Sequence, residues 1–152
     1  MGTWIYASQE KLNAIVDQVK EQHPGLAVRV AFVGYRDYGD NERFSLMDFT
    51  EAVNDVKEKI KAQTADGGGD TPEDVQGAFH KALRMSWNPD SIKNIVFISD
   101  APGHGFWRYD DFPNGLPEGY KLEDQMNTFA DQKIRFTFLK LDSNCDKMIK
   151  AM

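Results

Sequence analysis

The chain has 152 residues, of which 41% are hydrophobic and 12% aromatic, so it is long enough to bury the core of one domain. Its formal net charge is −6, which argues against nucleic acid or an anionic membrane as a partner. A lone cysteine, Cys145, excludes an internal disulfide and a cysteine-based zinc cluster, and we expect it to be a half-buried thiol rather than a nucleophile.

The first third of the chain predicts a helix followed by two strands. Apolar residues between Ile5 and Val19 recur on one helical face, and the sequence His23-Pro24-Gly25 ends that helix. Residues 26–35 form an apolar run rich in Val, typical of a strand covered on both faces. After the turn "RDYGDNE", residues 43–49 predict a second strand, paired antiparallel with the first.

The rest of the chain alternates helices with strands. Helical spacing over 53–60 and 75–83 predicts two helices on either side of the stretch "DGGGDTPED". Residues 92–99 predict a buried strand, 121–132 a helix and 134–141 a strand, and "NCDKMIKAM" resembles the start of another helix. This order predicts an α/β fold around a mostly parallel sheet. Because the chain starts and stops on helices, we expect a single domain, 1–152, truncated at both ends.

No apolar run reaches the ~18 residues of a membrane span, and the N-terminus lacks the pattern of a secretory signal. We therefore expect a soluble, cytoplasmic protein without a membrane partner.

Two residues are candidates for a metal site. Asp100 directly follows the strand at 92–99 and Thr71 starts the next predicted helix upstream, so both are expected at the carboxyl edge of the sheet. A hydroxyl and a carboxylate are hard oxygen ligands that suit Mg²⁺, Mn²⁺ or Ca²⁺. Simpler roles compete with this one. Thr71, Pro72 and Asp74 make a helix capping box, and Asp100 is suited to cap the turn that follows it.

The long loop at 101–120 is expected to be functional rather than disordered, since it is rich in aromatic residues and prolines. His104 is expected to be a structural or rim residue, and Asp110 and Asp111 to be solvated loop charges. The tryptophans are expected to pack rather than to stack on bases. No phosphate-binding loop or hydrolytic triad is present, and Pro102 replaces the second Asp of a dehalogenase-type site, so catalysis is not predicted.

Six segments together resemble the von Willebrand factor A domain, and more narrowly the version found in proteins that carry an α-kinase domain. They are "WIYASQEKL", "VAFVGYRDYGD", "GGGDTPEDVQGAF", "ISDAPGHG", "DDFPNGLPEG" and "FTFLKLDSNCDKMI". The resemblance implies a three-layer, Rossmann-like sandwich with one antiparallel edge strand. It also implies a metal-ion-dependent adhesion site, in which Thr71 and Asp100 match the ligands of the second and third loops. The ion, Mg²⁺ or Mn²⁺, would be completed by an acidic side chain of a protein partner.

The sequence departs from this family at its start. The Asp-x-Ser/Thr-x-Ser loop and the strand that carries it would precede Met1, so the first strand is expected to be missing and the facing strand edges to be unpaired. We then expect metal binding to be weak or absent, unless another chain donates a strand.

Three functions remain open: a metal-dependent protein-binding module, an accessory domain of an α-type Ser/Thr protein kinase whose catalytic domain is absent, or a metal-free scaffold that binds through the loop at 101–120.

Overall fold

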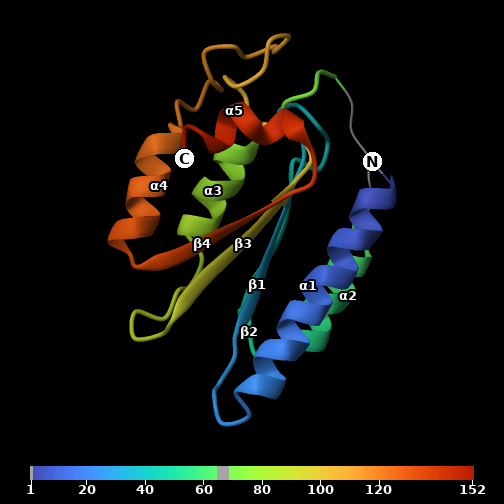
Figure 1. Ribbon diagram of the computed structural model, residues 1–152, viewed down its shortest axis with the longest axis vertical. Helices are drawn as coiled ribbons and strands as arrows, with labels where there is room; N and C mark the ends of the chain where they lie inside the picture. The colour runs from blue at the N-terminus through green and yellow to red at the C-terminus, as the bar shows by residue number, and fades with distance from the viewer. Residues whose placement is uncertain (1, 65–68) are drawn as a thin grey trace.

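The computed structural model describes residues 2–64 and 69–152, with side chains described from Glu10 onward in the first helix. The side chains of Trp4 and Ile5, and residues 65–68 with the first two glycines of the glycine stretch, therefore lie outside the described residues. The elements follow the order α1 (Gly2–Gln22), β1 (Val30–Tyr35), β2 (Phe44–Thr50), α2 (Val53–Lys61), α3 (Val75–Leu83), β3 (Lys93–Ser99), α4 (Leu122–Asp131), β4 (Ile134–Lys140), the 3₁₀ turn η1 (Ser143–Cys145) and α5 (Asp146–Ile149) (Figure 1).

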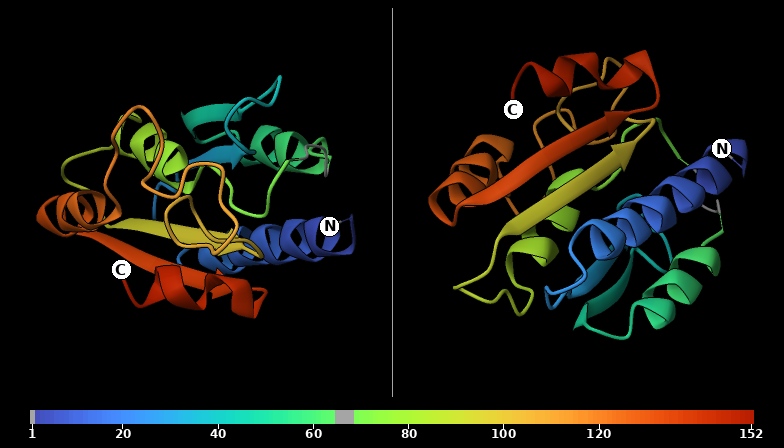
Figure 2. Two further views of the ribbon diagram at one scale, coloured as in Figure 1. Left: turned by 90° about the horizontal axis from the view of Figure 1, so that it is seen from above. Right: turned by 60° about the horizontal axis from the view of Figure 1, so that its bottom comes forward.

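The predicted α/β class is confirmed, and each predicted helix and strand is present within a few residues. The strands, however, form two sheets of two strands each. β1 pairs antiparallel with β2, and β3 pairs parallel with β4. A single, mostly parallel sheet is not formed in the described part of the chain, and the facing edges of β1 and β3 are unpaired, as expected. The three-layer sandwich stays a prediction. α3 and α5 lie on opposite sides of the β3–β4 pair (Figure 2).

Side chains rather than a backbone ladder connect the two sheets. The Tyr35 hydroxyl at the end of β1 donates to Ser99 Oγ at the end of β3, over 2.9 Å. The Tyr35 ring also lies against Phe97 of β3, with 6.0 Å between ring centroids. The carboxyl ends of β1 and β3 therefore meet, although the two strands exchange no ladder hydrogen bonds.

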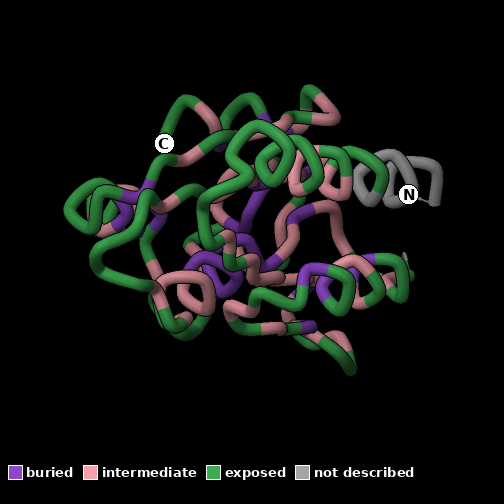
Figure 3. Tube along the Cα trace, turned by 90° about the horizontal axis from the view of Figure 1, so that it is seen from below, coloured by how far each residue is buried: buried purple, intermediate pink, exposed green. Residues whose placement is uncertain are grey.

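The hydrophobic core surrounds the β3–β4 pair, with residues from α3 and α4 and from the C-terminal η1 and α5. Phe79 is at its centre, with its ring centroid 4.9 Å from Phe97, 5.7 Å from Phe129 and 5.4 Å from Phe136, all in edge-to-face geometry. Cys145, expected to be half-buried, is instead fully buried in this cluster. The buried residues gather in the middle of the molecule and exposed ones surround them (Figure 3).

The predicted capping box at Thr71 is wrong. α3 begins at Val75, and its N-cap is Asp74, whose Oδ1 accepts a hydrogen bond from Gly77 N at 2.7 Å. The turn after β3 is likewise capped by Ser99 and not by Asp100, because Ser99 Oγ donates to the Ala101 carbonyl over 2.7 Å. Among the described residues, the capping roles that were the alternatives to metal binding for Thr71 and Asp100 are thus filled by Asp74 and Ser99.

Within residues 2–64 and 69–152, no helix is both long enough and apolar enough to cross a lipid bilayer.

Candidate functional site

Three connecting segments converge beyond the carboxyl ends of β1 and β3. They are the loop after β1 (36–43), the segment that leads into α3 (69–74) and the long loop after β3 (100–121) (Figure 1). Backbone hydrogen bonds tie them together: Glu73 N donates to Pro102 O at 2.9 Å, and Asp74 N donates to Arg36 O at 3.3 Å. Glu73 and Gly103 also form a parallel bridge. The convergence brings polar side chains from distant parts of the sequence to one edge.

One side chain from each segment contributes to a group that can hold a metal ion. Ligand atoms of Asp37, Asp70 and His104 all lie within 4.8 Å of one another. The His104 side chain is fully buried, and its Nε2 lies 2.7 Å from Asp37 Oδ1. One imidazole nitrogen and two carboxylates are ligands found in protein sites for divalent ions.

Asp110 holds the imidazole of His104 from the other side. Its Oδ1 lies 2.7 Å from His104 Nδ1 and accepts a hydrogen bond from Phe112 N, also at 2.7 Å. Its Oδ2 accepts from Gly105 N at 2.6 Å. The Asp110 side chain is 0% exposed, so the prediction that it is a solvated loop charge is wrong. Asp111, for which the same was predicted, is exposed.

The charges around His104 favour its protonated form when no metal is present. Burial opposes the imidazolium, but the hydrogen bonds to Asp110 and Asp37 and the charges of these carboxylates outweigh it, so the pKa of His104 is raised. The same edge carries further negative charge. Burial, and then the charges of Asp37, Asp40 and Asp100, raise the pKa of Glu73 to about 7. This edge of the molecule therefore attracts cations.

Asp70 differs from the other carboxylates of the group. Its Oδ2 accepts a hydrogen bond from the backbone N–H of Asp111 at 2.6 Å. Its Oδ1 is buried and has no hydrogen-bond partner in the part of the chain that the structure describes. A buried carboxylate oxygen without a donor is costly, so this atom is suited to a bound cation.

The bridge between Glu73 and Gly103 aligns the two segments that carry the candidate ligands Thr71 and Asp100. Both residues are half-buried, and among the described residues no hydrogen bond or ion pair engages the carboxylate of Asp100. Neither belongs to the group around His104. Their role as ligands of one ion therefore stays a prediction.

Sequence reasoning missed Asp37 and Asp70 and undervalued His104. The position of Asp37 could have indicated its role. It lies just beyond β1, as Asp100 lies just beyond β3, and the carboxyl ends of both strands are at the same edge of the molecule. Asp70 directly precedes Thr71, within the stretch already singled out. No comparable signal marks Asp110, because its burial depends on how the long loop folds back on itself.

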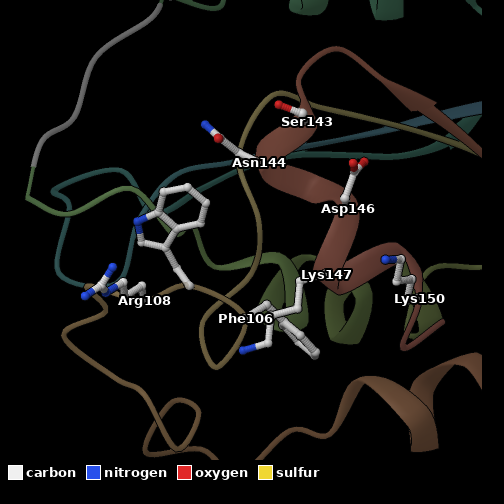
Figure 4. Close-up of a pocket in the computed structure, with 8 residues that line it drawn as sticks. Phe106, Arg108, Ser143, Asn144, Asp146, Lys147 and Lys150 are labelled. Atoms are coloured by element: carbon white, nitrogen blue, oxygen red, sulfur yellow. The ribbon is translucent and has the colours of Figure 1, made fainter.

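A separate hollow of about 660 Å³ lies between the long loop and the C-terminal helix (Figure 4). Three cationic side chains, from Arg108, Lys147 and Lys150, share its lining with Phe106 and Trp107. The three cations are exposed, so the hollow is an open depression on the surface and not an enclosed site.

Comparison with known proteins shows what the chain is similar to. No model of a protein family matches it. Over 142 residues it is 28% identical to a protein of Dictyostelium discoideum named "Alpha-protein kinase vwkA". The aligned region covers 91% of this chain and 23% of that protein. Over 107 residues it is 29% identical to "Putative ariadne-like RING finger protein R811" of Acanthamoeba polyphaga mimivirus. This second aligned region covers 68% of this chain and 10% of that protein. The chain is thus homologous to a small part of an α-protein kinase.

Proposed function

We propose that this chain is a protein-binding module of the von Willebrand factor A type, whose ligand recognition depends on a divalent ion at the carboxyl edge of the strands. The observation that carries this proposal is the convergence of the segments at 69–74 and 100–121, joined by the bridge between Glu73 and Gly103. Thr71 and Asp100 belong to these segments, and no capping role occupies either of them.

In this proposal Thr71 supplies a hydroxyl and Asp100 a carboxylate to Mg²⁺ or Mn²⁺. Both are hard oxygen donors, and the excess of carboxylates at this edge favours a cation there. An acidic side chain of the protein partner, or a strand donated by another chain, would supply further ligands. With two protein ligands the ion keeps most of its water, so we expect millimolar affinity at best in the isolated chain.

A thermal melt tests the metal dependence. Mg²⁺ at ten times its dissociation constant stabilises a folded protein by about 1.4 kcal/mol, which for a chain of this length raises Tm by roughly 3–6 °C relative to EDTA. Thr71→Ala and Asp100→Ala are expected to abolish the shift, and Asp111→Ala, which removes an exposed carboxylate nearby, to preserve it. Equal shifts in all four proteins would show that the ion binds elsewhere. The absence of a shift in the parent chain would favour the metal-free scaffold.

The similarity to part of an α-protein kinase favours a second role, as an accessory domain of such an enzyme. The second relative carries the name of a RING finger protein, so similar segments occur in proteins whose names describe different activities. This supports a module that recognises partners over one that catalyses phosphoryl transfer. Incubation of the chain with Mg-ATP and a protein substrate rich in Ser and Thr is expected to yield no phosphoprotein. Robust phosphorylation that survives repurification would refute this.

A further inference from the structure

We propose that Asp37, Asp70 and His104 form a second metal site, separate from Thr71 and Asp100, that binds a divalent transition ion such as Zn²⁺ through one imidazole nitrogen and two carboxylates. The three ligands come from three different segments, and the backbone bonds that join these segments hold them in place before any ion arrives.

Asp110 and Asp37 hold the two ring nitrogens of His104 from opposite sides. Both oxygens of Asp110 accept a backbone N–H, from Gly105 and Phe112, so Asp110 faces the His104 ring as a hydrogen-bond acceptor. His104 Nδ1 therefore carries the hydrogen that it donates to Asp110 at 2.7 Å. In the neutral imidazole, Nε2 then presents a lone pair to Asp37 Oδ1, which is also an acceptor and lies only 2.7 Å away. Either a proton or a metal ion has to lie between two such atoms.

A buried oxygen of Asp70 distinguishes a metal ion from a proton at this site. Asp70 Oδ1 is buried and has no donor among the described residues, while Oδ2 is held by the backbone N–H of Asp111 at 2.6 Å. A proton on His104 satisfies Asp37 but leaves Asp70 Oδ1 without a partner. A metal ion bound by all three residues satisfies both, which is why the geometry favours an ion over a simple ion pair.

The donor set selects the class of ion. Mg²⁺ and Ca²⁺ prefer shells made of oxygen, whereas an imidazole nitrogen suits Zn²⁺ and its neighbours in the transition series. Three protein ligands leave the fourth position of tetrahedral Zn²⁺ open to water or to a partner side chain. Asp110 then acts as a positioning residue, because a carboxylate that accepts from the distal ring nitrogen fixes the tautomer and orientation of a ligating histidine.

Titration with Zn²⁺, and with Co²⁺ as a spectroscopic probe, tests this site. The background variant carries His23→Gln and His80→Gln, which leaves His104 as the single imidazole. We expect saturable binding of one ion and the visible absorption bands of four-coordinate Co²⁺. Asp70→Asn keeps an acceptor for the Asp111 N–H and removes the ligand charge, so it should weaken binding at least tenfold without loss of fold. His104→Gln should abolish the cobalt bands.

Asp110→Asn is expected to weaken binding by about 10–100-fold and to shift the cobalt bands. Its matched control, Asp111→Asn, makes the same chemical change at the next residue, where the side chain is exposed, and should change nothing. Thr71→Ala and Asp100→Ala should leave Zn²⁺ affinity within about twofold, so the two metal sites can fail independently. The absence of stoichiometric binding, or binding that survives Asp70→Asn in a folded protein, would overturn this inference.

Discussion

The substitution Gly77→Ala tests how Asp74 holds the start of α3. It is expected to destabilise the chain, although alanine normally favours a helix over glycine. Gly77 is the third residue of α3, and its N–H donates to the N-cap carboxylate of Asp74. A Cβ at this position would lie well within 3.0 Å of that carboxylate, a distance that real Cβ atoms essentially never show. The Asp74 side chain would have to leave its place, where it is 0% exposed.

The magnitude follows from what Asp74 would lose. Loss of the cap costs about 1 kcal/mol. Asp74 also accepts a charged hydrogen bond from Arg43 Nε, an interaction worth about 1.5–3 kcal/mol. Replacing glycine by alanine within a helix returns about 1 kcal/mol. We therefore expect Gly77→Ala to lower the free energy of unfolding by about 2 kcal/mol and Tm by roughly 4–8 °C.

Urea denaturation of four proteins measures the effect: the parent, Gly77→Ala, Asp74→Ala and the double variant. Without the carboxylate there is nothing for the new methyl group to displace, so in the Asp74→Ala background Gly77→Ala should be neutral or stabilising by up to about 1 kcal/mol. Gly25→Ala is the matched control, because a Cβ added there would have nothing within 4 Å of it. A Gly77→Ala chain as stable as the parent, or a loss of the same size in both backgrounds, would refute the reasoning.

Three other predictions concern the core, the lone thiol and a surface hydrogen-bond cluster. Phe79→Ala, at the centre of the aromatic core, should cost about 3–5 kcal/mol in urea denaturation, and a cost below that of Phe79→Leu would contradict the packing described. Burial raises the pKa of Cys145 to about 11, so its thiol should resist an aromatic disulfide reagent at pH 8 until urea unfolds the chain; a rapid native reaction would contradict its burial. Hydrogen bonds from Ser86 and Phe49 N hold the pKa of Asp48 below its ordinary value, so Asp48 contributes stability above about pH 4 that is lost as pH falls through the lowered pKa. Asp48→Asn should therefore destabilise the chain at pH 7 more than at pH 2.5, and an unchanged difference would count against this.

Periodicity located the helices and strands because each is long enough to show a repeat, as with the spacing from Val53 to Ile60. Boundaries set by a single polar contact were harder to predict. The capping box at Thr71 matched the expected pattern, yet the helix starts only at Val75 because the buried Asp74, paired with Arg43, caps it instead. Arg43 lies 31 residues away from Asp74 in the sequence, so no local rule reveals that competition.

The arrangement of the strands was also predictable only in part from the sequence. The pairing of β1 with β2 follows from their direct connection by the loop at 36–43, and that of β3 with β4 from a single crossover helix, so both could be expected. How the two pairs meet depends on side chains, chiefly Tyr35 and Ser99, which carry no pattern in the sequence. The candidate site behaves likewise: the edge was predictable from strand ends, but the burial of His104 between Asp37 and Asp110 required the folded loops.

The way the two sheets meet bears on what a bound ion would do to this fold. Asp37 follows β1 and His104 follows β3, so an ion held by both would connect loops that leave different sheets. The direct link between the ends of these strands is otherwise the hydrogen bond from Tyr35 to Ser99 and the contact of Tyr35 with Phe97. A cross-link of this kind stabilises the folded chain by its full binding free energy, since the unfolded chain does not assemble the ligands. The proposed Zn²⁺ site would therefore stabilise the whole chain at low concentrations of the ion, whereas an ion bound only weakly at Thr71 and Asp100 would do so only at millimolar concentrations.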